Sequence, residues 1–165
     1  MAILTANQLG ELHNQVHAKQ VKAINSDFVF VIKGYEHMWL LGKQCPWPEI
    51  SSAGEIEVPG PAGTAHWQAQ IAKGNLQGAV TLMETQAGEV DDMLLSLLAG
   101  GGYFDARVYE GTSPDNYRCY KELKKCFLQI DMPDRDWENR GQILQFNGTL
   151  FFHYYGEKVM GTGKF

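Results

Sequence analysis

The sequence lacks the features that mark membrane-spanning, secreted and disulfide-rich proteins. Its 165 residues contain no apolar run of roughly 18 residues, the length that a membrane-spanning helix needs. The three cysteines, Cys45, Cys119 and Cys126, are odd in number and show no Cys-x-x-Cys spacing. Residues 1–8 lack the basic start and the apolar stretch of a cleaved signal peptide. We therefore expect a protein that is made in the cytoplasm with its thiols reduced.

Motifs for catalysis and for cofactor binding are equally scarce. No G-x-S-x-G nucleophile turn occurs. Gly156 and Gly161 have the separation of a phosphate-binding loop, but Thr162-Gly163 stands where that loop needs Lys-Ser or Lys-Thr. His13 and His17 have the spacing of two metal ligands on one helix face, but the glutamate that a zinc protease carries between them is missing. We predict no enzyme activity, no cofactor and no metal.

An acidic segment, residues 131–140, gathers several carboxylates at close spacing. Because paired carboxylates can perform acid–base hydrolysis, a hydrolase that uses Asp131, Asp134, Asp136 or Glu138 stays an alternative. Arginines in the same segment favour a solvated loop, in which Arg135 and Arg140 pair with the acids, or a contact between subunits, in which the tryptophan is the anchor. The residues of this expected subunit-contact loop are Asp134, Arg135, Asp136, Trp137 and Arg140.

Net charge and composition narrow the class of protein further. With 14 Lys and Arg residues against 19 Asp and Glu, the chain carries a formal net charge of −5. A chain this acidic is a poor ligand for the nucleic-acid backbone over a broad surface. Hydrophobic residues make up 44% and charged residues 20% of the sequence, which excludes wholesale disorder. At this length we expect one domain with a core that needs neither disulfides nor a metal.

Two segments have helical periodicity. A capping box precedes an apolar stripe formed by Leu9, Leu12 and Val16, and predicts an N-terminal helix over about residues 6–24. This stripe is thin and needs a partner surface. A second helix is expected at about residues 88–99, because acidic residues occupy its first turn and an apolar face follows. The residues of that face are Val90, Met93, Leu94, Leu97 and Leu98.

Most of the remaining chain has the period-two pattern of β-strands. We expect strands at residues 27–33, 38–44, 55–58, 65–71, 76–85, 103–110 and 142–155. The first two should form a hairpin, and residues 117–130 allow either a long strand or part helix. These elements predict a mainly β protein, an antiparallel β-sandwich or barrel with one flanking α-helix at about 88–99 and the N-terminal helix at about 6–24.

The order of these elements matches a known arrangement. The turn Cys45-Pro46-Trp47-Pro48-Glu49 is followed by a hairpin at 55–71, a strand at 78–84, a helix at 89–99, and strands at 104–110 and 148–155. This order resembles the tail tube proteins of contractile-tailed bacteriophages, whose fold the tube proteins of bacterial contractile secretion systems share. The resemblance implies an N-terminal helical arm at 1–26, a β-sandwich tube domain at 27–156 and a C-terminal tail at 157–165.

This resemblance implies a structural virion protein that is not an enzyme. Copies would form hexameric rings that stack into the inner tail tube of a contractile tail, and double-stranded DNA would pass through the tube, without specific binding, during ejection into the host. The protein would be located in the virion tail after assembly in the host cytoplasm. Its partners would be itself, tail sheath proteins and baseplate proteins, with no membrane contact.

The hairpin at residues 55–71 is the expected contact between rings. Its Pro-Gly-Pro tip is stiff and loses little conformational entropy on docking. The residues of this expected inter-ring hairpin are Glu55, Glu57, Pro59, Gly60, Pro61 and Trp67. Open strand edges would pair with neighbouring copies in a closed ring. The strand at 27–33, apolar on both faces, would then have the core on one side and a neighbour on the other.

Two other functions stay open at this point. One is a tube-initiator or baseplate ring protein of the same fold. The other belongs to a different class, a ligand-binding β-barrel with an apolar pocket. The residues that would line this pocket are Trp39, Trp47, Trp67 and Phe152.

Overall fold

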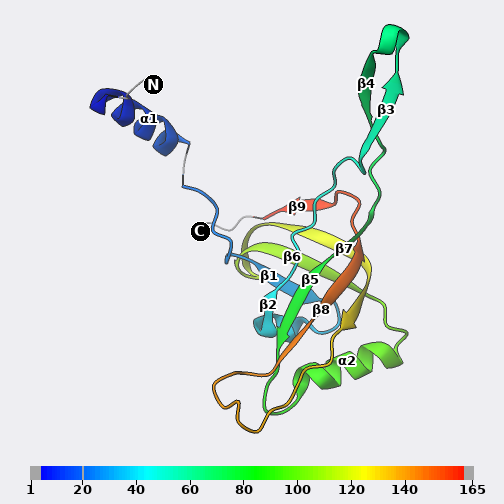
Figure 1. Cartoon of the computed structure of the whole chain (residues 1–165). Coiled ribbons are helices and arrows are strands. Elements are labelled where there is room, and N and C mark those ends of the chain that lie inside the picture. The colour runs from blue at the N-terminus through cyan, green and yellow to red at the C-terminus, as the bar shows by residue number, and fades with distance from the viewer. Residues whose placement is uncertain (1–4, 20, 162–165) are drawn as a thin grey trace.

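The computed structural model describes residues 5–19 and 21–161 (Figure 1). Residues 1–4 of the expected arm, residue 20 and residues 162–165 of the expected tail lie outside the described residues. The helices are α1 (Ala6–Ala18) and α2 (Glu89–Ala99), with short 3-10 helices η1 (Glu36–Leu41) and η2 (Pro61–Gly63). The strands are β1 (Val29–Ile32), β2 (Gly42–Gln44), β3 (Glu55–Pro59), β4 (Ala65–Ala69), β5 (Asn75–Met83), β6 (Phe104–Ser113), β7 (Asn116–Ile130), β8 (Gln145–His153) and β9 (Lys158–Met160).

One bent antiparallel sheet forms the body of the molecule. Its strand order is β1-β6-β7-β8-β5-β2, and β9 also pairs with β7, while β3 and β4 form a separate two-stranded sheet. The long strand β7 pairs with β6 and β9 in its first part and with β8 in its last part. A register shift between Lys124 and Phe127, with Lys125 at a φ of 45°, marks the bend. The predicted mainly β architecture is confirmed, and residues 117–130 are strand.

The core lies between the two halves of this sheet and under α2 (Figure 1). Val80, Leu123 and Leu150 are fully buried there, and the alternation expected for the last long strand places Phe146, Phe152 and Tyr154 on the same buried side. On α2, Val90 and Met93 are buried, and Leu94 and Leu97 pack against the core. Leu98 is instead 73% exposed, so the apolar face expected for this helix was too broad.

The first turn of α2 is capped by Glu84, a residue that precedes the helix in the sequence. Gly88 is the N-cap in a left-handed conformation, as a glycine allows, and has no side chain to donate or accept. The carboxylate of Glu84, at the end of β5, accepts hydrogen bonds from the amides of Val90 and Asp91, both at 2.9 Å. This carboxylate satisfies two amides at the positive end of the helix and fixes α2 to the sheet.

Three sequence expectations near the N-terminus were wrong. The N-terminal helix ends at Ala18, with Lys19 as its C-cap, instead of continuing to about residue 24. Of the strand expected at 38–44, residues 38–41 belong to η1 and residues 42–44 are the strand β2. The expected hairpin does not form, because β2 pairs with β5 and not with β1. In a 3-10 helix the side chains three apart lie on one side, and here Met38 and Leu41 both face the core. The pattern of apolar residues in so short a segment cannot distinguish this 3-10 helix from a strand.

Strand β1 is covered on both faces by its own chain. Phe30 and Ile32 belong to the main core, while Val29 and Val31 pack with Tyr109 in a second cluster. Trp39, Tyr117 and Tyr120 also pack against that second cluster. The expectation that a neighbouring copy covers the outer face of residues 27–33 was therefore wrong, because aromatic side chains from η1 and β7 take that place.

A close approach between β7 and β8 makes Gly148 a sensitive position. A Cβ atom on Gly148 would overlap the carbonyl oxygen of Gln129, and it would lie 2.8 Å from the Cα of Ile130. We expect Gly148→Ala to destabilise the fold by about 1–3 kcal/mol, because the backbone of two central strands must separate. Chemical denaturation measures this loss. Gly141→Ala is the matched control, since nothing lies within 4 Å of its Cβ position. Equal denaturation midpoints for the two variants would contradict the close approach.

Candidate assembly surfaces

The hairpin of β3 and β4 projects from the body as an arm, residues 55–69 (Figure 1). Its register pairs Glu57 with Trp67 and Pro59 with Ala65. Directly opposed residues share a face of a hairpin, so Glu55, Glu57 and Pro59 lie on the same face as Trp67. The structure therefore brings four of the six expected hairpin residues to one side, around a tryptophan that is 71% exposed.

The tip of the arm is held by its own hydrogen bonds. The amide of Gly60 donates to the carbonyl of Thr64 at 2.6 Å, and the amide and hydroxyl of Thr64 donate to the carbonyl of Pro61 at 3.2 and 2.7 Å. Two prolines fix their own φ angles at the same turn. The tip thus has one defined shape, so its docking on another surface would cost little conformational entropy.

The arm has little support from the body of the molecule. Every residue of β4 is exposed, and only Val58 of β3 is partly covered. A two-stranded hairpin is marginally stable by itself in water. Ile56 and Trp67 also present apolar side chains to solvent. An arm of this composition gains stability from a surface that covers it.

A buried lysine anchors the chain that leads into the arm. The ammonium of Lys121, on β7, donates to the carbonyl of Pro48 and to the carboxylate of Glu49, both at 2.7 Å. It also lies 4.5 Å from the centre of the Trp47 ring. Sequence reasoning missed this residue among the neighbouring lysines. The alternation of buried Cys119, Lys121 and Leu123 on the same face of β7 is the signal that could have found it.

Two carboxylates, those of Glu49 and Glu110, make the stability of the fold depend on pH. The Lys121 ammonium lowers the pKa of Glu49 below its ordinary 4.5. The Arg118 guanidinium, whose Nε donates to Glu110 at 3.1 Å, lowers the pKa of the Glu110 carboxyl from the same ordinary value of 4.5. Both carboxylates bind protons more weakly in the folded protein than in the unfolded chain. Their contribution to the free energy of unfolding is therefore present above pH 4.5 and is lost as the pH falls through their folded pKa values.

We expect the melting temperature to fall as the pH drops below 4.5, and Glu110→Gln to flatten that dependence. Melting curves followed by circular dichroism across this pH range measure both effects. Asp115→Asn, in the turn between β6 and β7, serves as the control because no ion pair of the described residues includes Asp115. A slope that Glu110→Gln leaves unchanged would contradict the assigned role of the Arg118–Glu110 pair.

The acidic loop, residues 131–140, lies at the end of the body that is opposite the arm (orange in Figure 1). Trp137 is 98% exposed, and Met132 is exposed as well. The expected pairing of Arg135 and Arg140 with the acids does not occur among the described ion pairs. The loop presents an unshielded tryptophan among charged residues, and tryptophan is a residue type that is enriched at protein interfaces. The carboxylates do not line the three cavities described below, so nothing in their placement favours a hydrolase.

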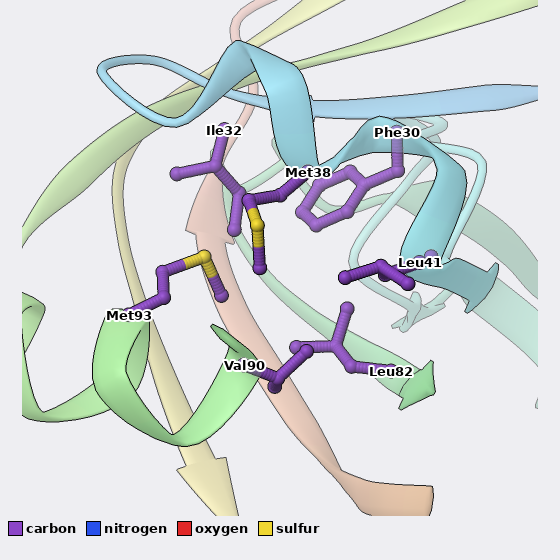
Figure 2. Close-up of a pocket in the computed structure, with 8 residues that line it drawn as sticks. Phe30, Ile32, Met38, Leu41, Leu82, Val90 and Met93 are labelled. Carbon is purple, nitrogen blue, oxygen red and sulfur yellow. The ribbon is translucent and has the colours of Figure 1, made fainter. Parts of the chain in front are cut away.

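The apolar cavity near α2 is too small for a ligand. Figure 2 shows Met38, Val90 and Met93 converging on it from η1 and α2, and its volume is about 10 Å³. This is about the space of one water molecule. Larger openings, of about 120 and 780 Å³, lie at the surface and are lined by mixed polar and apolar residues.

The aromatic residues expected to line a ligand pocket do not converge. Trp67 lies on the arm, Phe152 in the main core, Trp39 beside β1 and Trp47 beside Lys121. The structure therefore gives the ligand-binding β-barrel no pocket built from these residues.

Among the described residues, no further metal ligand joins the histidine pair on α1. The rings of His13 and His17 lie edge to face with centroids 6.0 Å apart. Within residues 5–19 and 21–161, no three His, Cys, Asp or Glu side chains gather in a way that could hold a metal ion. None of the helices described there is long and apolar enough to cross a membrane.

Comparisons with known proteins identify the fold. No family model matches the chain, and no curated protein matches it. Among solved structures, the tube terminating cap of the anti-feeding prophage matches with a TM-score of 0.56 at 11% identity, over 86% of this chain and 93% of that chain. A chain of the sheath-tube complex of PVC, an extracellular contractile injection system in its extended state, matches with a TM-score of 0.56 at 14% identity, over 90% and 96%.

The sheath/tube terminator of the same PVC system matches with a TM-score of 0.56 at 12% identity, over 87% of this chain and 99% of that chain. These structures span nearly the whole chain and all come from contractile injection systems. The chain therefore has the fold of their tube-type proteins, as its order of elements predicted. Its structural neighbours are parts of particles in which tube, sheath and terminating proteins assemble.

Proposed function

We propose that this chain is a structural protein that assembles with itself into stacked hexameric rings, the inner tail tube of a phage-like contractile tail. The single observation that carries the proposal is that a tube-type fold occurs together with the β3–β4 arm, which the rest of the chain leaves uncovered. The parts would be a tube domain at 27–156, an N-terminal arm at 1–26 and a tail at 157–165.

Open strand edges support closure into a ring. β2 ends the strand order of the main sheet with Lys43 and Gln44 exposed, and β9 is a further edge whose three residues are all exposed. At the other end of the strand order, β1 is buried and offers no open edge. Such edges expose unpaired amides and carbonyls that pair readily with another strand. A head-to-tail contact that closes after a fixed number of copies covers each edge once per subunit.

The two ends of the molecule support stacking. The arm projects at one end and the acidic loop lies at the other (Figure 1). In a stack, the Trp67 face of the arm would dock on the adjacent ring, and Asp134, Arg135, Asp136, Trp137 and Arg140 would contact a neighbouring subunit. Sheath and baseplate proteins would be the outer partners of the assembled tail, a virion component assembled in the host cytoplasm. With a net charge of −5, the subunit would let DNA pass without binding it.

A second candidate is a ring that starts or ends the tube. The similarity to a terminating cap and to a sheath/tube terminator, equal in TM-score to the match in the sheath-tube complex, favours this candidate. Quantitative mass spectrometry of purified particles separates the two roles. A tube subunit is present in many rings' worth of copies, whereas a terminal subunit is present in one ring's worth.

Sedimentation velocity over a range of protein concentrations tests self-assembly. We expect a monomer at low concentration and a discrete ring species, with larger stacks, as the concentration rises. A single monomeric species up to the solubility limit would overturn the proposal.

A further inference from the structure

The N-terminal helix is well formed but uncovered. The amide of Gln8 donates to the Thr5 hydroxyl at 3.3 Å, and the Gln8 side chain accepts from the Thr5 amide at 2.8 Å, which completes a capping box. Leu9, Leu12 and Val16 line one side of α1, and all three are exposed. A helix of this length is marginal alone in water, so it gains stability from an apolar surface that covers this stripe.

The outer face of α2 is a second uncovered apolar stripe on the same chain. Val90 and Met93 face the core, and the solvent-exposed side presents Leu95 and Leu98, which are three residues apart. Asp91 and Asp92 stand one turn before Leu95 and are exposed as well. This face of α2 is therefore apolar toward its C-terminus and acidic toward its N-terminus.

The two stripes match when the helices run antiparallel. Along α1 the order is Leu12, Val16 and then Lys19 at the C-cap; along α2, read backwards, it is Leu98, Leu95 and then Asp91. Each series spans seven residues, about 10 Å along a helix axis. Antiparallel packing places leucine and valine against leucine, and the lysine against the aspartate.

Charge and dipole favour the same arrangement. The end of α1 and the residues after it carry Lys19 and Lys22, and the first turn of α2 carries Glu89, Asp91 and Asp92. Opposite charges at the same end of an antiparallel pair attract, and the opposed helix dipoles add to this. Glu11, the acidic residue of α1, lies on the side away from the apolar stripe.

Within one chain the two helices lie at opposite sides of the β body, with the sheet between them (Figure 1). We propose that α1 of one subunit packs antiparallel on the outer face of α2 of a neighbouring copy of this chain, as a clasp between subunits. This inference rests on the proposed self-assembly and assigns its N-terminal arm a partner.

A charge exchange tests this clasp in the full-length protein. Lys19→Glu with Lys22→Glu, and separately Asp91→Lys with Asp92→Lys, should each raise the concentration at half-maximal assembly about tenfold, and the four changes together should restore it. Sedimentation velocity gives this concentration, and melting curves separate it from any loss of fold. Glu11→Lys, on the other side of α1, is the control and should have no effect.

Cross-linking tests which chains meet. Val16→Cys and Leu95→Cys chains, mixed and mildly oxidised, should form a disulfide-linked pair that neither chain forms alone. Three outcomes overturn the clasp while leaving self-assembly standing: normal assembly of both reversed variants, no restoration by the four changes together, or assembly without the mixed cross-link. Failure of the unaltered protein to assemble at any concentration overturns the proposed function itself.

Discussion

Val90→Asp should leave the protein unfolded. Val90 is 0% exposed, and with Leu82 and Met93 it lines the small apolar cavity between α2 and the sheet (Figure 2). Among the described residues that line this cavity there is no polar side chain to pair with a carboxylate. Burial of an unpaired charge costs several kcal/mol, which is comparable with the whole free energy of unfolding of an ordinary domain, about 5–15 kcal/mol.

Circular dichroism and thermal melting check this result against two other positions on the same helix. Leu98→Asp changes an exposed side chain and should leave the melting temperature nearly unchanged, and half-buried Leu94→Asp should fall between the two. The loss of melting temperature should therefore increase from Leu98 to Leu94 to Val90, in the order in which α2 buries these side chains. A cooperative transition of Val90→Asp at the temperature of the unaltered protein would contradict that packing.

Removal of the arm should abolish stacking without unfolding the body. Residues 55–69 are almost entirely exposed, and their strands pair only with each other. Replacing them with a short glycine-serine link should therefore leave the melting temperature of the body close to that of the unaltered protein. Rings should still form, but stacks of rings should be absent in electron micrographs.

Trp67→Ala tests the same surface with one side chain. A large exposed aromatic residue at the centre of a contact commonly contributes about 2 kcal/mol or more, so stacking should require at least about 30-fold more protein. Gln68→Ala is the matched control, because Gln68 is exposed on the opposite face of the same strand. Equal stacking by both variants would show that the Trp67 face is not the contact.

Much of the fold follows from sequence where one periodicity dominates. The helix at 89–99 has acidic residues at its start and an apolar face, and the structure has α2 at those residues. The last long strand alternates cleanly, and its buried residues Phe146, Leu150 and Phe152 are those of one face. The arm is predicted by its Pro-Gly-Pro turn, and its pairing then places Glu57 beside Trp67.

The remaining elements depend on contacts that the local pattern does not contain. Residues 38–44 were expected to be a strand, but residues 38–41 belong to η1, in which Met38 and Leu41 fill the space beside α2. β9 is a strand only because β7 offers it an edge to pair with. Lys121 looks like a surface lysine, and only the fold of residues 46–49 over β7 buries it against Glu49.

Negative-stain electron microscopy of the full-length protein at rising concentration tests the central claim most directly. The account predicts hollow rings of uniform diameter, followed by stacks of these rings at higher concentration. Fields of separate, monomer-sized particles at every concentration, from protein whose melting curve shows an intact fold, would contradict it.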